Sequence, residues 1–170
     1  VWAGPVFNPF DGTAVQLRVS RPVTPTNDLC AGAEVIPAAG PFPYLTSVAD
    51  TTLATTTSDP PAQTCTNQFV RSVWYKFTPG TMAAYEFSTC TNTATTVYDT
   101  LIGIYISSGG CGGAFTHVTC NDNSGCGGNS SDPNRRAVLT ASLTNGVGYY
   151  VVVWEAGTEP YTPGETSIQL

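Results

Sequence analysis

A run of oxygen-bearing side chains near the middle of the chain has the chemistry of a hard-cation site. Asn121, Asp122 and Asn123 are consecutive, and Asp99 precedes an apolar run of the kind that forms a buried strand. Asp28, beside a candidate turn, is a further ligand candidate. Calcium takes about six to eight oxygen ligands from carboxylates, amides and the backbone. These residues are therefore a candidate calcium site, unless the Asn and Asp side chains only stabilise turns through nearby backbone groups.

Catalysis has little support in the sequence. The one histidine, His117, lies between a threonine and a valine in a predicted strand, which is typical of a structural residue. No serine lies in the Gly-X-Ser-X-Gly context that exposes a nucleophile. Glycoside hydrolysis needs two acids held across a cleft, and the spacing of Asp99, Asp122 and Glu155 does not indicate such a pair. We therefore predict a protein that is not an enzyme, with calcium as the candidate cofactor.

Exposed aromatic side chains could bind a polysaccharide. Most tryptophans and tyrosines of this chain lie in predicted strands, where packing in a core is the commoner role. Tyr161 lies instead in the Gly- and Pro-containing loop 158–164. It is therefore the best candidate for a sugar-binding aromatic residue.

Six cysteines and one histidine favour three disulfides over a zinc site. Cys111 and Cys120 flank a segment of hairpin length, and Cys126 lies in the following loop. The predicted pairs, chosen among the many that six cysteines allow, are Cys30–Cys65, Cys90–Cys126 and Cys111–Cys120. Because disulfides persist in oxidising compartments, we predict an extracellular or cell-surface protein.

The charge balance argues against two classes of partner. The chain has 6 Lys+Arg against 12 Asp+Glu, and its net charge is -6. So few basic residues cannot neutralise a run of phosphates, which argues against nucleic acid. No stretch approaches the roughly 18 apolar residues that span a bilayer. We therefore predict neither nucleic-acid binding nor membrane insertion.

The elements that would position these residues are strands. Val, Ile, Thr and aromatic residues are abundant, and 17 Gly and 13 Pro mark many turns. Val73, Tyr75 and Phe77 alternate with Trp74 and Lys76, as on a strand with two different faces. We predict an all-β, jelly-roll-like two-sheet β-sandwich of about eight strands, stapled by disulfides. The predicted strands are 14–20, 70–78, 83–89, 100–107, 114–120, 137–143, 148–154 and 166–170, and residues 28–36 are predicted to form one helical turn.

The two ends of the chain are similar in sequence. In each, a Val-Trp pair is followed by a Gly- and Pro-containing loop and by a segment ending in Gln-Leu, at Leu17 and at Leu170. We interpret residues 1–20 as a strand segment like the C-terminal end of a preceding repeat. Residues 21–26 are then a Pro-containing linker, and residues 27–170 form the sandwich. The alternative is a chance likeness between two β-rich segments.

Several motifs occur in a co-linear order that carries a family resemblance. They are 27–33 (NDLCAGA), 72–77 (SVWYKF), 88–90 (STC), 98–105 (YDTLIGIY), 120–123 (CNDN) and 148–153 (GYYVVV). Together they make residues 27–170 similar to the bacterial pre-peptidase C-terminal domain and its secreted, cysteine-bearing relatives. The resemblance implies a non-catalytic secreted β-sandwich, used beside an enzyme or repeated in large surface proteins. Some such modules bind calcium, collagen or polysaccharide, but this chain has Asn121-Asp122-Asn123 where paired aspartates are frequent.

These observations predict a structural repeat of an extracellular filament or a giant surface adhesin. Copies of the chain would be joined head to tail through an N-terminal strand. That predicted inter-unit strand comprises Thr13, Ala14, Val15, Gln16, Leu17, Arg18 and Val19. Because Thr166–Leu170 already fills the equivalent place in its own unit, the pattern favours a continuous tandem chain or a strand built partly from each copy. The alternative function is an accessory carbohydrate- or protein-binding module of a secreted hydrolase, with calcium.

Overall fold

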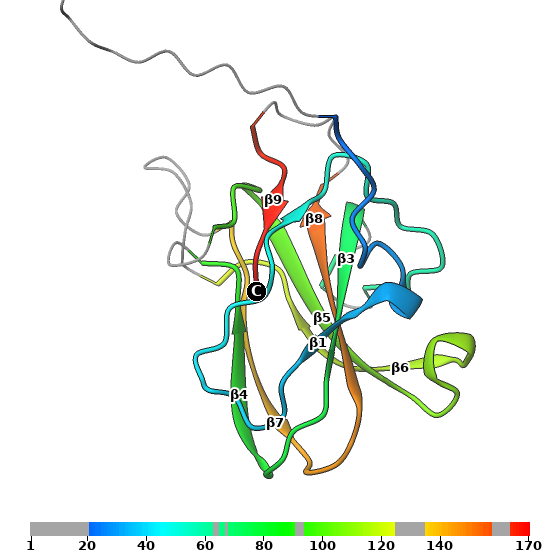
Figure 1. The fold of residues 1–170 in the computed structure, drawn as a ribbon, viewed down its shortest axis with the longest axis vertical. Coiled ribbons are helices and arrows are strands. Elements are labelled where there is room, and N and C mark those ends of the chain that lie inside the picture. Colours follow the sequence, from blue (N-terminus) through cyan, green and yellow to red (C-terminus); the bar gives the residue numbers. More distant parts are fainter. Residues whose placement is uncertain (1–20, 63–64, 67, 91–93, 125–134, 158–163) are drawn as a thin grey trace, which may run out of the picture.

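The computed structural model describes residues 21–170, apart from 63–64, 67, 91–93, 125–134 and 158–163. In that part the chain is an all-β, disulfide-bonded sandwich, as the sequence predicts (Figure 1). The strands are β1 (Glu34–Ile36), β2 (Ala49–Asp50), β3 (Phe69–Phe77), β4 (Ala83–Ser88), β5 (Thr100–Ser107), β6 (Phe115–Asn121), β7 (Val138–Leu143), β8 (Tyr149–Ala156) and β9 (Ser167–Ile168). Two short 3-10 helices, η1 (Cys30–Gly32) and η2 (Gly110–Gly112), complete the described elements.

The larger layer is a five-stranded sheet in the order β1-β3-β8-β5-β6. β1 is parallel to β3, and the other neighbours are antiparallel. β5 and β8 each have a neighbour on both sides, and six consecutive residues in each strand are buried. Strands covered on both faces need apolar residues throughout, which explains the near-continuous apolar runs in their sequences.

The second layer consists of two strand pairs, β4-β7 and β2-β9, both antiparallel. The main core lies between the two layers, and Val73, Tyr75 and Phe77 of β3 point into it. Trp74 lies on the opposite face of β3. The predicted alternation of this strand is therefore confirmed, and it separates two hydrophobic clusters.

The outer face of the five-stranded sheet carries the second cluster. Trp74, Trp154 and Tyr105 are fully buried there. They lie beneath residues 59–62 and 65, which we call the covering segment. Gly103 makes this packing fit, because a Cβ atom at that position would lie 2.9 Å from both the Trp154 and the Tyr105 ring. A glycine in the middle of a buried strand is thus explained by two large neighbours.

Two of the predicted disulfide pairs are wrong. Cys30 bonds Cys111 and Cys65 bonds Cys120, with Cα–Cα distances of 5.5 and 6.2 Å. Cys111 lies at the tip of the β5–β6 hairpin, whereas Cys120 is near the far end of β6. Because a strand rises about 3.3 Å per residue, these two cysteines are too far apart to bond each other.

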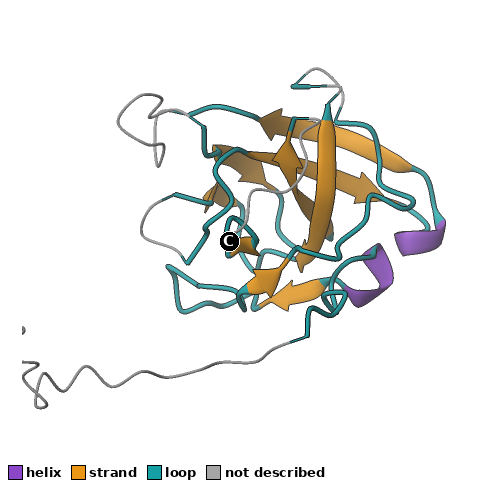
Figure 2. Cartoon of the chain, turned by 90° about the horizontal axis from the view of Figure 1, so that it is seen from above, coloured by secondary structure: helices purple, strands orange, loops and turns teal. Residues whose placement is uncertain are grey.

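Both disulfides therefore fasten other segments to the hairpin. Cys30 brings η1 against η2, and the two short helices lie side by side in Figure 2. Cys65 ties the covering segment to β6. Cys90 is also disulfide-bonded, and its predicted partner Cys126 lies outside the described residues.

Two further differences from the sequence prediction concern the N-terminal half. The helical turn predicted over residues 28–36 is limited to η1, and residues 34–36 form β1 instead because they pair with β3. β2 is not among the predicted strands, and its two residues are extended because they pair with β9. The predicted strand 14–20 lies outside the described residues.

Candidate functional site

The predicted cation ligands Asp99, Asn121 and Asp122 come together at one end of the five-stranded sheet. β5 begins directly after Asp99, and β6 ends at Asn121, which pairs with Ile102 of β5. Burial raises the pKa of the Asp122 carboxyl, and the charge of Asp99 raises it further. The antiparallel pairing of β5 with β6 thus brings the three oxygen-bearing residues to the same end of the hairpin.

Within the described residues, the buried Oδ1 atoms of Asn121 and Asp122 have no hydrogen-bond partner. Asp99, in contrast, accepts a hydrogen bond from Arg135 at 2.8 Å. Asn123 is exposed. The donor set has the chemistry that calcium prefers, but the described residues contain no group of three or more Asp, Glu, His or Cys side chains placed to hold a metal ion.

Asp28 does not belong to this cluster. Its carboxylate accepts hydrogen bonds from the backbone N–H of Thr55, at 2.5 Å, and from the Thr55 hydroxyl, at 3.1 Å. Asp28 is itself buried, and both of its carboxylate oxygens accept hydrogen bonds from Thr55. These bonds give Asp28 a structural role beside Thr55.

Two of the acids considered for glycoside chemistry, Asp99 and Glu155, lie at neighbouring positions, because Thr100 of β5 pairs with Glu155 of β8. Burial raises the pKa of the Glu155 carboxyl, and the nearby charge of Asp99 adds to that effect. Glu155 is, however, ion-paired with Arg71. His117 packs edge-on against Tyr105 with ring centroids 5.5 Å apart. Its Nε2 is buried and has no hydrogen-bond partner among the residues that the structure describes.

A buried carboxylate that the sequence reasoning missed organises the outer face. Asp59 accepts a hydrogen bond from the indole N–H of Trp74 at 3.0 Å and from that of Trp154 at 2.6 Å. Burial raises the pKa of Asp59, and the hydrogen bonds to its carboxylate only partly offset that effect. Through these two hydrogen bonds, the Asp59 carboxylate holds the covering segment against β3 and β8. An acid that directly precedes two prolines, 15 and 95 residues from the two tryptophans in sequence, gave no signal for this role.

The C-terminal strand β9 sits in a closely fitted slot. Ile168 is fully buried and Leu170 is 6% exposed, so both point into the main core. Between them, the side-chain amide of Gln169 donates to the Thr46 carbonyl at 2.7 Å and accepts from the Ala94 backbone N–H at 2.8 Å. Residues 46–51 flank β9 on one side and residues 94–97 on the other.

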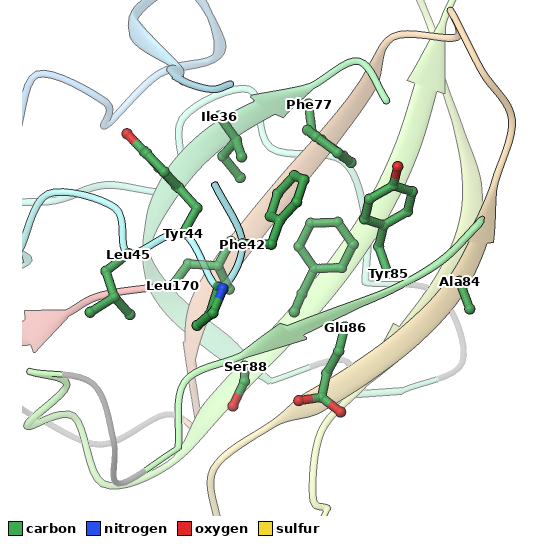
Figure 3. A pocket seen from close by; sticks show the side chains of 12 residues that line it. Ile36, Phe42, Tyr44, Leu45, Phe77, Ala84, Tyr85, Glu86, Ser88 and Leu170 are labelled. Carbon is green, nitrogen blue, oxygen red and sulfur yellow. The ribbon is translucent and has the colours of Figure 1, made fainter. Parts of the chain in front are cut away.

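An apolar groove lies next to the end of this slot, where Leu170 forms part of its wall (Figure 3). Residues 42–45 form one rim and β4 forms the other, around a volume of about 410 Å³. Ile36, Phe77 and Phe87 are buried beneath it. Phe42 is 50% exposed and Leu45 is 51% exposed, so the groove presents large apolar side chains to solvent.

The other predicted contact residues cannot be placed. Tyr161 and the strand Thr13–Val19 lie outside the described residues. No helix in the described ranges is long and apolar enough to cross a membrane. The disulfides indicate an oxidising, extracellular environment.

No protein-family model matches this chain, and neither a curated protein nor a solved structure matches it significantly. The fold and the surfaces described above therefore carry the functional argument.

Proposed function

We propose that the protein is a non-catalytic structural unit of an extracellular filament or giant surface adhesin, joined head to tail through its N-terminal strand. The observation that carries this proposal is the likeness between β9 and the N-terminal segment. Ser167-Ile168-Gln169-Leu170 packs with its apolar residues inward and its glutamine bridging both sides. Ala14-Val15-Gln16-Leu17 repeats that order of residues. A segment of this pattern is suited to be a strand of a sandwich.

The linker supports a position for that strand outside its own sandwich. Residues 21–24 are exposed, and two prolines stiffen the segment that leads into the domain. A sequence of strand-forming pattern that precedes a stiff linker suits β-augmentation, in which a strand of one molecule joins a sheet of another. Low charge, disulfides and shared strands would together resist unfolding and proteolysis outside a cell.

Paired substitutions in the N-terminal strand test this function. Val15→Asp with Leu17→Asp places charges on the face predicted to be buried in the neighbouring unit, whereas Ala14→Asp with Gln16→Asp places them on the opposite face. Sedimentation velocity on the full chain should show association for the wild type and the control pair, but a 17.8 kDa monomer for the first pair. A wild-type chain that remains monomeric at high concentration, or equal association of all three proteins, contradicts the proposal.

A second candidate function, a calcium-dependent accessory module that binds polysaccharide or protein, is favoured by one observation. It is that the buried Oδ1 atoms of Asn121 and Asp122 have no hydrogen-bond partner in the described part of the chain. Calcium should then raise the unfolding temperature of the wild type but not of Asp122→Ala, with magnesium as the control ion. Equal unfolding temperatures with and without calcium would remove this candidate.

A further inference from the structure

We propose that the groove between residues 42–45 and β4 receives the strand Thr13–Val19 of a second copy of this chain. This inference rests on the proposed function, because it names the surface through which neighbouring units would join. In this arrangement β9 stays in its slot, and the incoming strand binds in the neighbouring groove. The second layer therefore accommodates both segments.

The edge of β4 that does not pair with β7 is suited to a further strand. β4 pairs with β7 on one edge, and in the described part of the chain its other edge pairs with no strand. Residues 42–45 lie across the groove from that edge and belong to no strand either. Strand edges whose N–H and C=O groups face a groove are templates for another chain.

The length and direction of the incoming strand follow from the neighbouring pairs. β4 has six residues and spans about 20 Å, which a seven-residue strand such as Thr13–Val19 covers. The Thr46 backbone N–H donates to the Leu170 carbonyl at 3.0 Å, and residues 42–45 continue the Thr46 segment along the groove. A strand that extends the line of β9 therefore runs antiparallel to residues 42–46.

The side chains match on both faces. Val15, Leu17 and Val19 alternate with polar or small residues, so one face of the strand is apolar. That face would cover Phe42, Phe77 and Tyr85, whose rings meet in the groove in Figure 3. It would also cover Phe87, which lines the groove.

On the outward face, Glu86 of β4 is exposed and points away from the aromatic side chains in Figure 3. Arg18 lies on the outward face of the incoming strand. Opposite charges on neighbouring strands stabilise the pairing. The groove thus offers an acidic side chain to a strand whose outward face carries one basic residue.

Cysteine cross-linking between two differently substituted copies tests the location. No cysteine in the described part of the chain is free. Each variant therefore adds one reactive thiol, either in the N-terminal strand or in the described domain. Arg18→Cys is mixed with Glu86→Cys, and in parallel with Ala84→Cys to allow for a shifted register. The control partner is Val118→Cys, which is exposed on the edge strand β6 of the other sheet. Dimers are quantified on non-reducing gels, and wild-type association is measured by sedimentation velocity.

We expect several-fold more dimer with Glu86→Cys or Ala84→Cys than with Val118→Cys. Association of the wild type without this selective cross-link would overturn the groove as the docking site and leave the proposed function standing. A wild type that does not associate would overturn both. A double variant, Arg18→Cys with Glu86→Cys, that cross-links within one chain in dilute solution would show that the chain's own strand fills the groove, which also overturns the proposal.

Discussion

Replacing Asp59 by alanine should destabilise the sandwich by removing the acceptor that two buried indoles share. Trp74 and Trp154 are 1% and 0% exposed, and both donate their N–H groups to this carboxylate. A buried donor left without a partner costs about 1–3 kcal/mol. Loss of the partly buried charge returns some of that cost, because burial disfavours the ionised carboxyl. We therefore expect Asp59→Ala to lower the free energy of unfolding by about 2–4 kcal/mol.

Urea unfolding followed by tryptophan fluorescence measures this loss directly. The matched control is Asp50→Ala, because Asp50 is exposed and, within the described residues, its carboxylate accepts hydrogen bonds only from Thr52. The control should cost about 1 kcal/mol or less. If Asp59→Ala and Asp50→Ala unfold at the same urea concentration, Asp59 does not clamp the covering segment and the reasoning fails.

Three further outcomes follow from the structure. Gly103→Ala should cost about 1–3 kcal/mol in urea unfolding because its Cβ clashes with two buried rings, whereas Gly112→Ala, with open space around it, should be near neutral; equal costs would contradict the packing. Replacing Cys30 and Cys111 by serine opens a loop of 81 residues and should cost about 4–5 kcal/mol, and a non-reducing peptide map without this bridge would contradict the pairing. The raised pKa values of the Asp59, Asp122 and Glu155 carboxyls mean that the folded state binds protons more tightly than the unfolded state, so stability should rise as the pH falls from 7 toward about 5; a fall over that range would contradict the assigned directions.

Most strands could be predicted because the order of apolar and polar residues shows which side chains are buried in the core and which are exposed to solvent. β5, β7 and β8 carry clear apolar runs or alternation, and their predicted and observed bounds agree closely. β1 and β2 were not predictable, because segments this short are extended only through their pairing with β3 and β9. Tertiary contacts that are distant in sequence decide such elements.

The candidate sites also differ in whether local or distant contacts bring their residues together. Asp99, Asn121 and Asp122 could be grouped from sequence, since an antiparallel hairpin places the start of one strand beside the end of the next. Asp59 and the disulfide partners could not, because each depends on how the covering segment folds over the outer face. Local spacing alone favoured Cys111 with Cys120, although the extended hairpin keeps those residues apart.

Negative-stain electron microscopy of the native extracellular material, combined with gels after boiling with and without reductant, tests the central claim most directly. Head-to-tail assembly predicts filaments with an axial repeat. Bands near 17.8 kDa after boiling would indicate separate subunits, and very large species even after reduction would indicate a tandem chain. Compact single particles of 17.8 kDa, with no filaments, would contradict the account.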